Sequence, residues 1–343
     1  MDLILSLPIV SYFLAPSVAS WSTSLNLIFF YMTWSVLVLS HSALKIELIG
    51  LFALRLALWL APSLLFLAFD TLLPSVAASL KVGGASSLPS AQKNSAQLLR
   101  TFALTIFNLA LSAGLEAAVT MFWCYAFGGP VFKTSTTLPL PWQLVKHLAL
   151  LLAGREVLTY YIHSGILHAK SSNPVAKWHA EYAHSRRTPL FSLLLFADHP
   201  VPFLLHRFAP MYLPAMAVRP HLLVYLIHVA LCTGEETLAT SGYSVVPGII
   251  MGGIARRTAA HYASGGSGNY GAWGLLDWLH GTTRGQDVMG DMKDEAEKHA
   301  VKERGEKAAT NGLSVVKEGI DGLKKGGRGR PKKAKAEKEK EES

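Results

Sequence analysis

Histidines are the residues of this sequence most suited to chemistry. Nine of its 13 histidines fall between residues 163 and 261. Two stretches share the spacing H-x4-H: "HSGILH", with His163 and His168, and "HAEYAH", with His179 and His184. Histidine is the commonest nitrogen ligand for iron, zinc and copper, so the clustering indicates a metal centre. The alternative for either pair is that the rings lie at a membrane interface and reach toward lipid headgroups.

The spacing of these histidines sets which of them can share a helix face. On a regular α-helix a five-residue step turns a side chain by roughly 140°, so His163 and His168 meet at one ion only if the helix is distorted. Seven-residue steps are nearly two full turns and align His199 with His206, and His221 with His228 and Glu235. Ionisable side chains in apolar helices favour a functional role, although a polar stripe can also pack against another helix.

The elements that must position these residues are membrane helices. Half of the residues are hydrophobic and 16% are charged, whereas a soluble domain carries about 25% charge. Four stretches approach the roughly 20 apolar residues of a spanning helix: 24–40, 48–69, 98–127 and 141–162. Two shorter stretches, 190–208 and 211–231, contain breaking residues and predict a re-entrant hairpin or a pair of short helices. We therefore expect an all-α, polytopic membrane bundle of about four spanning helices plus a short hairpin, with a cytosolic histidine-rich cap.

The distribution of charge predicts orientation and three regions. Lys and Arg in 70–95, after His163 and in the tail place these segments in the cytosol, which leaves the loops around Lys45 and Lys133 in the lumen. We expect N-terminal transmembrane helices over 1–139, a histidine-bearing domain over 140–283 and a charged, largely disordered tail over 284–343. Residues 1–20 read as a retained hydrophobic segment. The tail's "GRGRP" resembles an AT-hook, but a solvated basic tail is favoured and a nucleic acid partner is unlikely.

The order of the motifs resembles the fatty acid hydroxylase and sterol desaturase superfamily of membrane di-iron enzymes. The resemblance covers about residues 140–283. It rests on the two H-x4-H pairs, then His199-Pro200, Ser241-Gly242-Tyr243, His261, Asn269-Tyr270-Gly271, and Asp277 before Gly281-Thr282. It implies iron, expected as a di-iron centre. The candidate metal ligands are His163, His168, His179, His184, His199, His228, His261 and Glu236.

The sequence also departs from the family pattern. Members hold their two irons with eight or more histidines, whereas Tyr182, Glu236, Thr240, Thr258 and Tyr262 stand here where histidines are expected. Carboxylates compatible with iron could compensate; they are Glu181, Asp198, Glu235 and Glu236. Equally, the chain could hold one metal ion or none, and spacing does not separate these alternatives.

The resemblance implies activation of O2 and hydroxylation or desaturation of a lipid, which could be a sterol, a sphingolipid or a fatty acyl chain. The sequence shows neither a cytochrome b5-like His-Pro-Gly-Gly segment nor a dinucleotide fingerprint, so cytochrome b5 or a separate reductase is the expected electron donor. We expect a multi-pass protein of the endoplasmic reticulum membrane with both termini cytosolic. The alternative is a non-catalytic membrane scaffold or lipid-binding relative that has lost its metal ligands. A transporter with a histidine proton relay ranks last.

Overall fold

The computed structural model describes residues 21–89, 95–169, 173–184, 190–246 and 248–298. The expectations for segment 1–20, for Lys170, Arg186 and Arg187, and for the tail from residue 299 fall outside these residues. The chain divides into two compact units, Met1–Asp291 and Met292–Ser343, and the fold and site below belong to the first. Helices and no β-strand occur among the described residues, which confirms the expected all-helical class.

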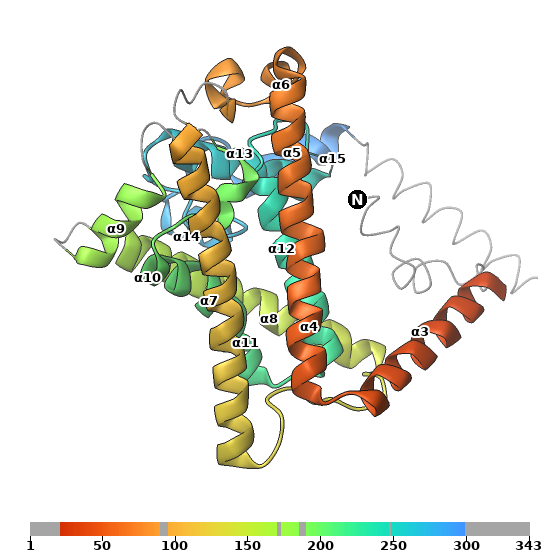
Figure 1. The fold of residues 1–343 in the computed structure, drawn as a ribbon. Helices are drawn as coiled ribbons and strands as arrows, with labels where there is room; N and C mark the ends of the chain where they lie inside the picture. Colours follow the sequence, from red (N-terminus) through yellow and green to blue (C-terminus); the bar gives the residue numbers. More distant parts are fainter. Residues whose placement is uncertain (1–20, 90–94, 170–172, 185–189, 247, 299–343) are drawn as a thin grey trace, which may run out of the picture. The chain divides into compact units, whose positions relative to one another are not determined.

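The N-terminal helices form long apolar rods. They are α3 (Trp21–Ser40), α4 (Ala43–Arg55), the π-helical turn η1 (Leu56–Leu60), α5 (Ala61–Leu72), α6 (Pro74–Leu80), the 3₁₀ turn η2 (Gly84–Ser87) and α7 (Ser95–Phe127). Because η1 joins α4 to α5 without a break, residues 43–72 form one continuous rod. Figure 1 shows this rod and α7 running antiparallel beside each other, and α4 packs on α7.

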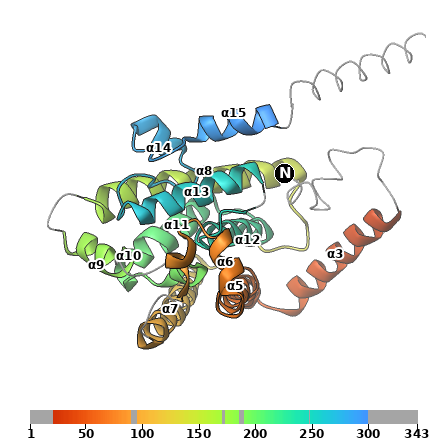
Figure 2. The ribbon, with the colours of Figure 1, turned by 90° about the horizontal axis from the view of Figure 1, so that it is seen from above.

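The C-terminal helices are shorter and carry the histidines. They are α8 (Pro141–Ile162), the π-helical turn η4 (His163–Leu167), α9 (Pro174–Tyr182), the 3₁₀ turn η5 (Ser192–Phe196), α10 (Pro200–Phe203), the π-helical turn η6 (Leu204–Phe208), α11 (Ala209–Val218), α12 (Leu222–Ala239), α13 (Ile249–Ala263), α14 (Leu275–His280) and α15 (Val288–Lys298). Seen from above, α5 and α7 are viewed nearly end-on while α8 lies across their direction (Figure 2). Helix α8 packs against α11 and α12.

Three helices in the described part of the chain are long and apolar enough to cross a membrane, namely Ala43–Leu72, Leu98–Phe127 and Leu222–Ala239. The first two correspond to predicted stretches. The third differs from the prediction, because the chain breaks at Arg219-Pro220-His221, with Arg219 at φ 48°, and a continuous helix begins only at Leu222. Stretch 24–40 is a shorter apolar helix. Stretch 141–162 is helical but contains Arg155 and Glu156, both buried.

Over 190–208 the chain forms short helices, in line with the second of the two predicted alternatives, a re-entrant hairpin or a pair of short helices. All five residues of η5 are buried, and Trp59 of η1 donates its indole N–H to the Ser192 carbonyl at 3.2 Å. Pro200 starts α10 and His199 caps it by accepting from the Val201 amide at 3.3 Å. The irregular backbone of this region is thus covered by protein. Such cover is needed because peptide groups without a helical partner must find hydrogen bonds elsewhere.

Backbone pairs show which connections lie at the same end of the helices. Residues 80–82 pair with 242–244 through the Val82 amide to the Gly242 carbonyl at 3.0 Å and the Ser244 amide to the Leu80 carbonyl at 2.8 Å. At the opposite end of α12, the Leu222 amide donates to the Lys133 carbonyl at 2.9 Å. The segment after α5 therefore meets the end of α12, and the loop after α7 meets its start.

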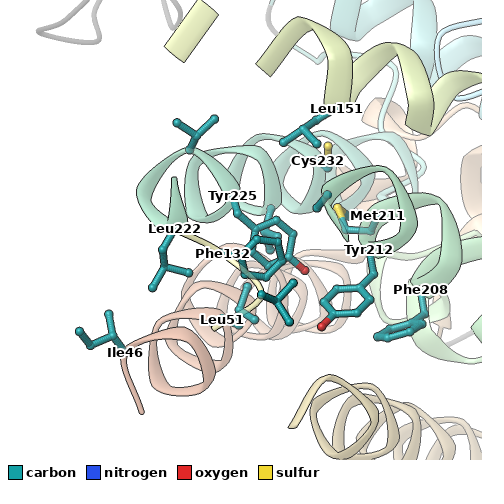
Figure 3. Packing of buried hydrophobic residues seen from close by; sticks show 14 of the residues in the cluster. Ile46, Leu51, Phe132, Leu151, Phe208, Met211, Tyr212, Leu222, Tyr225 and Cys232 are labelled. Carbon is teal, nitrogen blue, oxygen red and sulfur yellow. The ribbon is translucent and has the colours of Figure 1, made fainter. Parts of the chain in front are cut away.

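Aromatic and aliphatic side chains from α3, α4, α8, η6, α11, α12 and the loop after α7 form the main core. The Phe132 and Tyr225 rings stack at 4.3 Å between centroids, and Tyr212 meets the Phe132 ring edge-on at 6.1 Å (Figure 3). Leu51 of α4 and Leu151 of α8 are buried in the same cluster. Because this core joins α4, α8, α11 and α12, it fixes the crossing helix α8 that ends at the first histidine pair.

A buried ion pair joins the rod to α7. Arg55 donates to both carboxylate oxygens of Glu116, at 2.6 and 3.1 Å, and both side chains are buried. Two parallel bonds of this kind fix geometry as well as charge. Removing one partner leaves an uncompensated buried charge, whereas replacing both by apolar residues leaves none.

We predict that Glu116→Ala lowers the free energy of unfolding by about 3–5 kcal/mol, because it strands the Arg55 guanidinium. The double variant Arg55→Met with Glu116→Leu should recover most of that loss. The measurement is thermal or denaturant unfolding of the purified protein in detergent. A single variant as stable as the parent chain would show that the pair does not hold the two helices.

Candidate metal centre

A π-helical turn brings the first histidine pair together. Helix α8 ends at Ile162, and the His168 amide then donates to the His163 carbonyl at 3.0 Å across η4. This bond from residue i+5 to residue i widens the turn, so that five residues complete roughly one turn. The two rings consequently lie 4.8 Å apart between centroids. The regular-helix expectation that they point apart does not hold, because the backbone leaves the α conformation at His163.

The second pair converges because the chain leaves the helix. Asn173 caps α9 by accepting from the Val175 amide at 2.9 Å, and the helix ends at Tyr182. His184 therefore lies beyond the last turn, and its ring folds back so that its Nε2 is 3.2 Å from the Nε2 of His179. Both H-x4-H pairs thus bring their two rings together, the first through a π-helical turn and the second through the end of helix α9.

Two further histidines complete the group. His261 of α13 places its Nε2 3.3 Å from the Nε2 of His184. His206, in the π-helical turn η6, lies 4.0 Å from His163 between ring centroids. We call these six residues the histidine cage: His163, His168, His179, His184, His206 and His261. The ligand atoms of the first four lie within 4.8 Å of one another, so they could hold a metal ion.

Hydrogen bonds on the outer side of three rings orient the cage. The Nδ1 of His179 lies 2.6 Å from the Asp198 carboxylate. The Nδ1 atoms of His163 and His261 lie 3.0 and 2.6 Å from the carbonyls of Tyr270 and Gly268. A carbonyl or carboxylate partner assigns the proton to Nδ1 and turns the Nε2 lone pair inward, which is the arrangement of metal-binding histidines.

Two of the inward-facing nitrogens are buried without a hydrogen-bond partner among the described residues, which costs free energy. The Nε2 atoms of His163 and His168 are buried and accept no hydrogen bond from the described residues. A buried polar atom without a partner costs about 1–3 kcal/mol. A metal ion would satisfy these lone pairs, so the donor set fits a nitrogen-ligated transition metal.

The segment 268–271 supplies two of the three outer partners, the carbonyls of Gly268 and Tyr270, and Asp277 holds it. The Asp277 carboxylate accepts from the amides of Tyr270 and Gly271 at 2.8 and 2.7 Å, and from the Thr282 hydroxyl at 2.7 Å. Asn269 has a left-handed φ of 56° and donates its side-chain amide to the Arg257 carbonyl at 3.1 Å. The turn is thus fixed with its carbonyls aimed at the cage.

Two positions before Asn269 must be glycine, because neighbouring atoms lie too close to leave room for a side chain. A Cβ on Gly266 would overlap the His168 ring, and one on Gly268 would overlap the Thr282 carbonyl. Both glycines also have positive φ, 88° and 84°, a conformation that side chains disfavour. The glycine run in "SGGSGNYG" therefore allows the backbone to pass directly over the metal-facing rings.

Burial favours the neutral form of five of the six cage histidines. It lowers the pKa of His168 to about 3 and that of His261 to about 4. Burial also lowers the pKa values of His163, His184 and His206, and neighbouring imidazoles lower them further. Neutral rings offer lone pairs at physiological pH, which metal binding requires.

Three predicted ligands, His199, His228 and Glu236, contact other residues and are not part of the histidine cage. His199 stacks on Trp178 at 4.5 Å between ring centroids while capping α10. His228 is fully buried in α12, with its Nδ1 3.6 Å from the Cys232 sulfur. Glu236 lines the same cavity as the cage but binds the Arg155 and Arg207 guanidinium groups at 2.8 and 3.2 Å.

Sequence reasoning omitted His206 from the ligands and assigned Asp198 no orienting role. The seven-residue step from His199 to His206 was visible, but the prolines at 200 and 202 obscured which ring turns inward. Asp198 was considered as a ligand, whereas it accepts from the outer nitrogen of His179. No spacing rule indicated that contact, because the two residues belong to separate elements.

Two hollows meet at the cage. The inner cavity has a volume of about 60 Å³ and is lined by five cage histidines together with Arg155, Arg207, Glu235 and Glu236. This is room for ions and water-sized molecules. A larger hollow of about 1070 Å³ shares His184 and Tyr262 with it, and small side chains such as Gly83, Ala180 and Ala263 line the rest.

Comparison with known families agrees with this geometry. Residues 148–282 match the family model described as fatty acid hydroxylase. These residues contain all six cage histidines and the turn held by Asp277, and no solved structure matches the chain. The match identifies residues 148–282 as a fatty acid hydroxylase domain, consistent with the fatty acid hydroxylase and sterol desaturase superfamily that the motifs resemble.

We predict that Asp198→Asn weakens metal binding by about 10–100-fold, because an amide cannot stabilise the Nδ1 proton as a carboxylate does. The measurement is competition between the purified protein and a chelator of known affinity. Asp287→Asn, a carboxylate that caps α15 by accepting from the Gly290 amide, is the matched control. Equal affinity of the Asp198 variant and this control would remove the orienting role.

We predict that the metal-free protein loses stability as pH falls below about 6.5. The folded chain holds the pKa values of His168 and His261 well under the ordinary 6.5, so the unfolded chain takes up protons that the folded chain excludes. The contribution of these neutral rings to the free energy of unfolding is complete above pH 6.5 and is lost as the pH falls toward about 4. At about pH 5 the loss is about 2 kcal/mol per ring. Unfolding temperatures in detergent across this range, with His168→Gln showing a shallower fall, test the prediction. A flat profile would contradict it.

Proposed function

We propose that the protein is a membrane-bound, iron-dependent oxidoreductase that hydroxylates or desaturates a lipid with O2. The observation that carries the proposal is the histidine cage, whose inward nitrogens converge inside a fatty acid hydroxylase domain. Imidazole ligands suit iron. Three helices able to cross a membrane lie in the same chain, so the expected substrate is one that resides in a bilayer.

The cage residues would hold iron, which when bound supplies the activation of O2 and the attack on an unactivated C–H bond. The protein's part is to exclude water and orient the rings. The outer partners Asp198, Gly268 and Tyr270 fix three imidazoles before any ion arrives. Preorganised ligands of this kind need little rearrangement on binding.

The larger hollow supports a bulky substrate. Its volume of about 1070 Å³ is at the upper end of the range for small-molecule sites, about 300–1,000 Å³. Glycine, alanine and serine residues make up most of its walls, which leaves space for an acyl chain or a ring system. Because His184 and Tyr262 line both hollows, a lipid lying in the larger one would present a C–H bond beside the cage.

The reaction requires electrons from another protein. Hydroxylation inserts one oxygen atom of O2 into a C–H bond and reduces the other to water, while desaturation removes two hydrogens and reduces both oxygen atoms to water. Each reaction consumes a pair of electrons and protons beyond those of the substrate. We propose cytochrome b5 or a reductase as the donor and the endoplasmic reticulum membrane as the location, with both termini in the cytosol where such a donor acts.

We predict that His163→Ala or His184→Ala abolishes lipid oxidation while membrane insertion is retained. Each change removes an inward imidazole without touching a helix able to span the membrane. The measurement compares lipids of cells producing each variant and the parent chain, by mass, for products that gain an oxygen or lose two hydrogens. His199→Ala is the matched control, because its ring stacks on Trp178 outside the cage.

Parent-specific products that persist in both cage variants would remove those histidines from the site. Loss of product in His199→Ala as well would show that the effect is not particular to the cage. Purified parent protein without bound transition metal after iron loading would contradict the enzyme and favour a scaffold or lipid-binding relative.

A further inference from the structure

The inner cavity has two chemically different walls. One wall is the histidine cage. The rest of the lining includes two arginines and two glutamates from α8, η6 and α12: Arg155 binds Glu235 at 2.9 Å and Glu236 at 2.8 Å, and Arg207 binds Glu236 at 3.2 Å. The Trp273 indole also donates to Glu235 at 2.9 Å. The two positive and two negative charges balance one another; both oxygens of Glu235 are engaged, and both arginines share the Oε1 of Glu236.

Four of the positions at which the family pattern has histidines lie on this cavity. They are Glu236, Thr240, Thr258 and Tyr262, and all four line it. The Thr240 hydroxyl donates to the Glu236 backbone carbonyl at 2.7 Å. Arg207 forms an ion pair with Glu236 at 3.2 Å and lines the same cavity as Tyr262. In the part of the cavity where the family pattern predicts further histidine ligands, this chain thus has the Arg207 guanidinium and the Glu236 carboxylate that binds it.

The size of the cage fits one ion. First-row metals bind imidazole nitrogen at about 2.0–2.1 Å, which places ligand atoms no more than about 4.2 Å apart. The four ligand atoms of His163, His168, His179 and His184 lie within 4.8 Å of one another, so a shift of a few tenths of an ångström closes them on one centre. With four rings on one ion, a second ion about 3.5–4 Å away would have only His206 and His261 left in the cage and would need further ligands at Glu236, Thr240, Thr258 or Tyr262.

We propose that this centre holds a single metal ion, and that the Arg207 guanidinium, held by Glu236, occupies the side of the cavity where a second ion would bind. The inference rests on the proposed function, since both need metal in the cage. Arg155 and Arg207 both bind the Oε1 of Glu236, so a metal ion at this carboxylate would compete with two guanidinium groups for its negative charge. The residues therefore fit a mononuclear centre and do not fit the di-iron pair expected from the resemblance.

The test is the metal content and spectrum of the full-length protein purified in detergent. After loading with Fe²⁺ and removal of excess, we expect about one iron per chain by elemental analysis. Loading with Mn²⁺ should give the electron paramagnetic resonance spectrum of an isolated ion. Two ions per chain with a spin-coupled spectrum would overturn this inference and leave the proposed function standing. No bound metal would overturn both.

A variant tests the role assigned to the guanidinium. Arg207→His removes the fixed cation, releases one bond to Glu236 and adds an imidazole, so the iron content should rise toward twice that of the parent chain. Arg256→His is the matched control, because Arg256 pairs with Asp291 and does not line the cavity; its iron content should stay unchanged. An unchanged count in Arg207→His would show that Arg207 does not exclude a second ion.

Discussion

The structure depends on imidazole rings whose outer nitrogens are tied to the protein and whose inner nitrogens face one another. Asp198 and the carbonyls of Gly268 and Tyr270 hold three of these rings by their Nδ1 atoms. The buried Nε2 atoms of His163 and His168 have no hydrogen-bond partner among the described residues, and a metal ion could satisfy them. The glycine-rich turn, the Asp277 anchor and the π-helical turns all serve this convergence.

The membrane helices explain why the convergence can be so tight. Helix α8 lies across the direction of the rods and is fixed by a core shared with α4, α11 and α12 (Figures 2 and 3). Its last residue leads directly into the turn with His163. On the same unit, the rod of residues 43–72 is joined to α7 by the buried pair of Arg55 and Glu116. The scaffold thus positions the histidines before any ligand binds.

The sequence predicted the helical class, two of the three helices able to span a membrane, and the motifs of the family domain, because apolar length and residue order are local properties. It did not predict the π-helical turns, because the bond from His168 to His163 depends on packing around α8 rather than on spacing. His206 was not among the predicted ligands for the same reason, since η6 rotates its ring away from the alignment with His199. The continuous helix from Leu222 differed because Pro220 lies before the helix, not inside it.

X-ray absorption spectroscopy of the iron-loaded protein tests the central claim most directly, because it reports the atoms around the metal. The account predicts a first shell of nitrogen at about 2.0–2.1 Å, with the outer-shell scattering of several imidazole rings, and loss of part of that scattering in His184→Ala. A first shell of oxygen alone, without imidazole scattering, would show that the six rings do not bind the metal and would contradict the account.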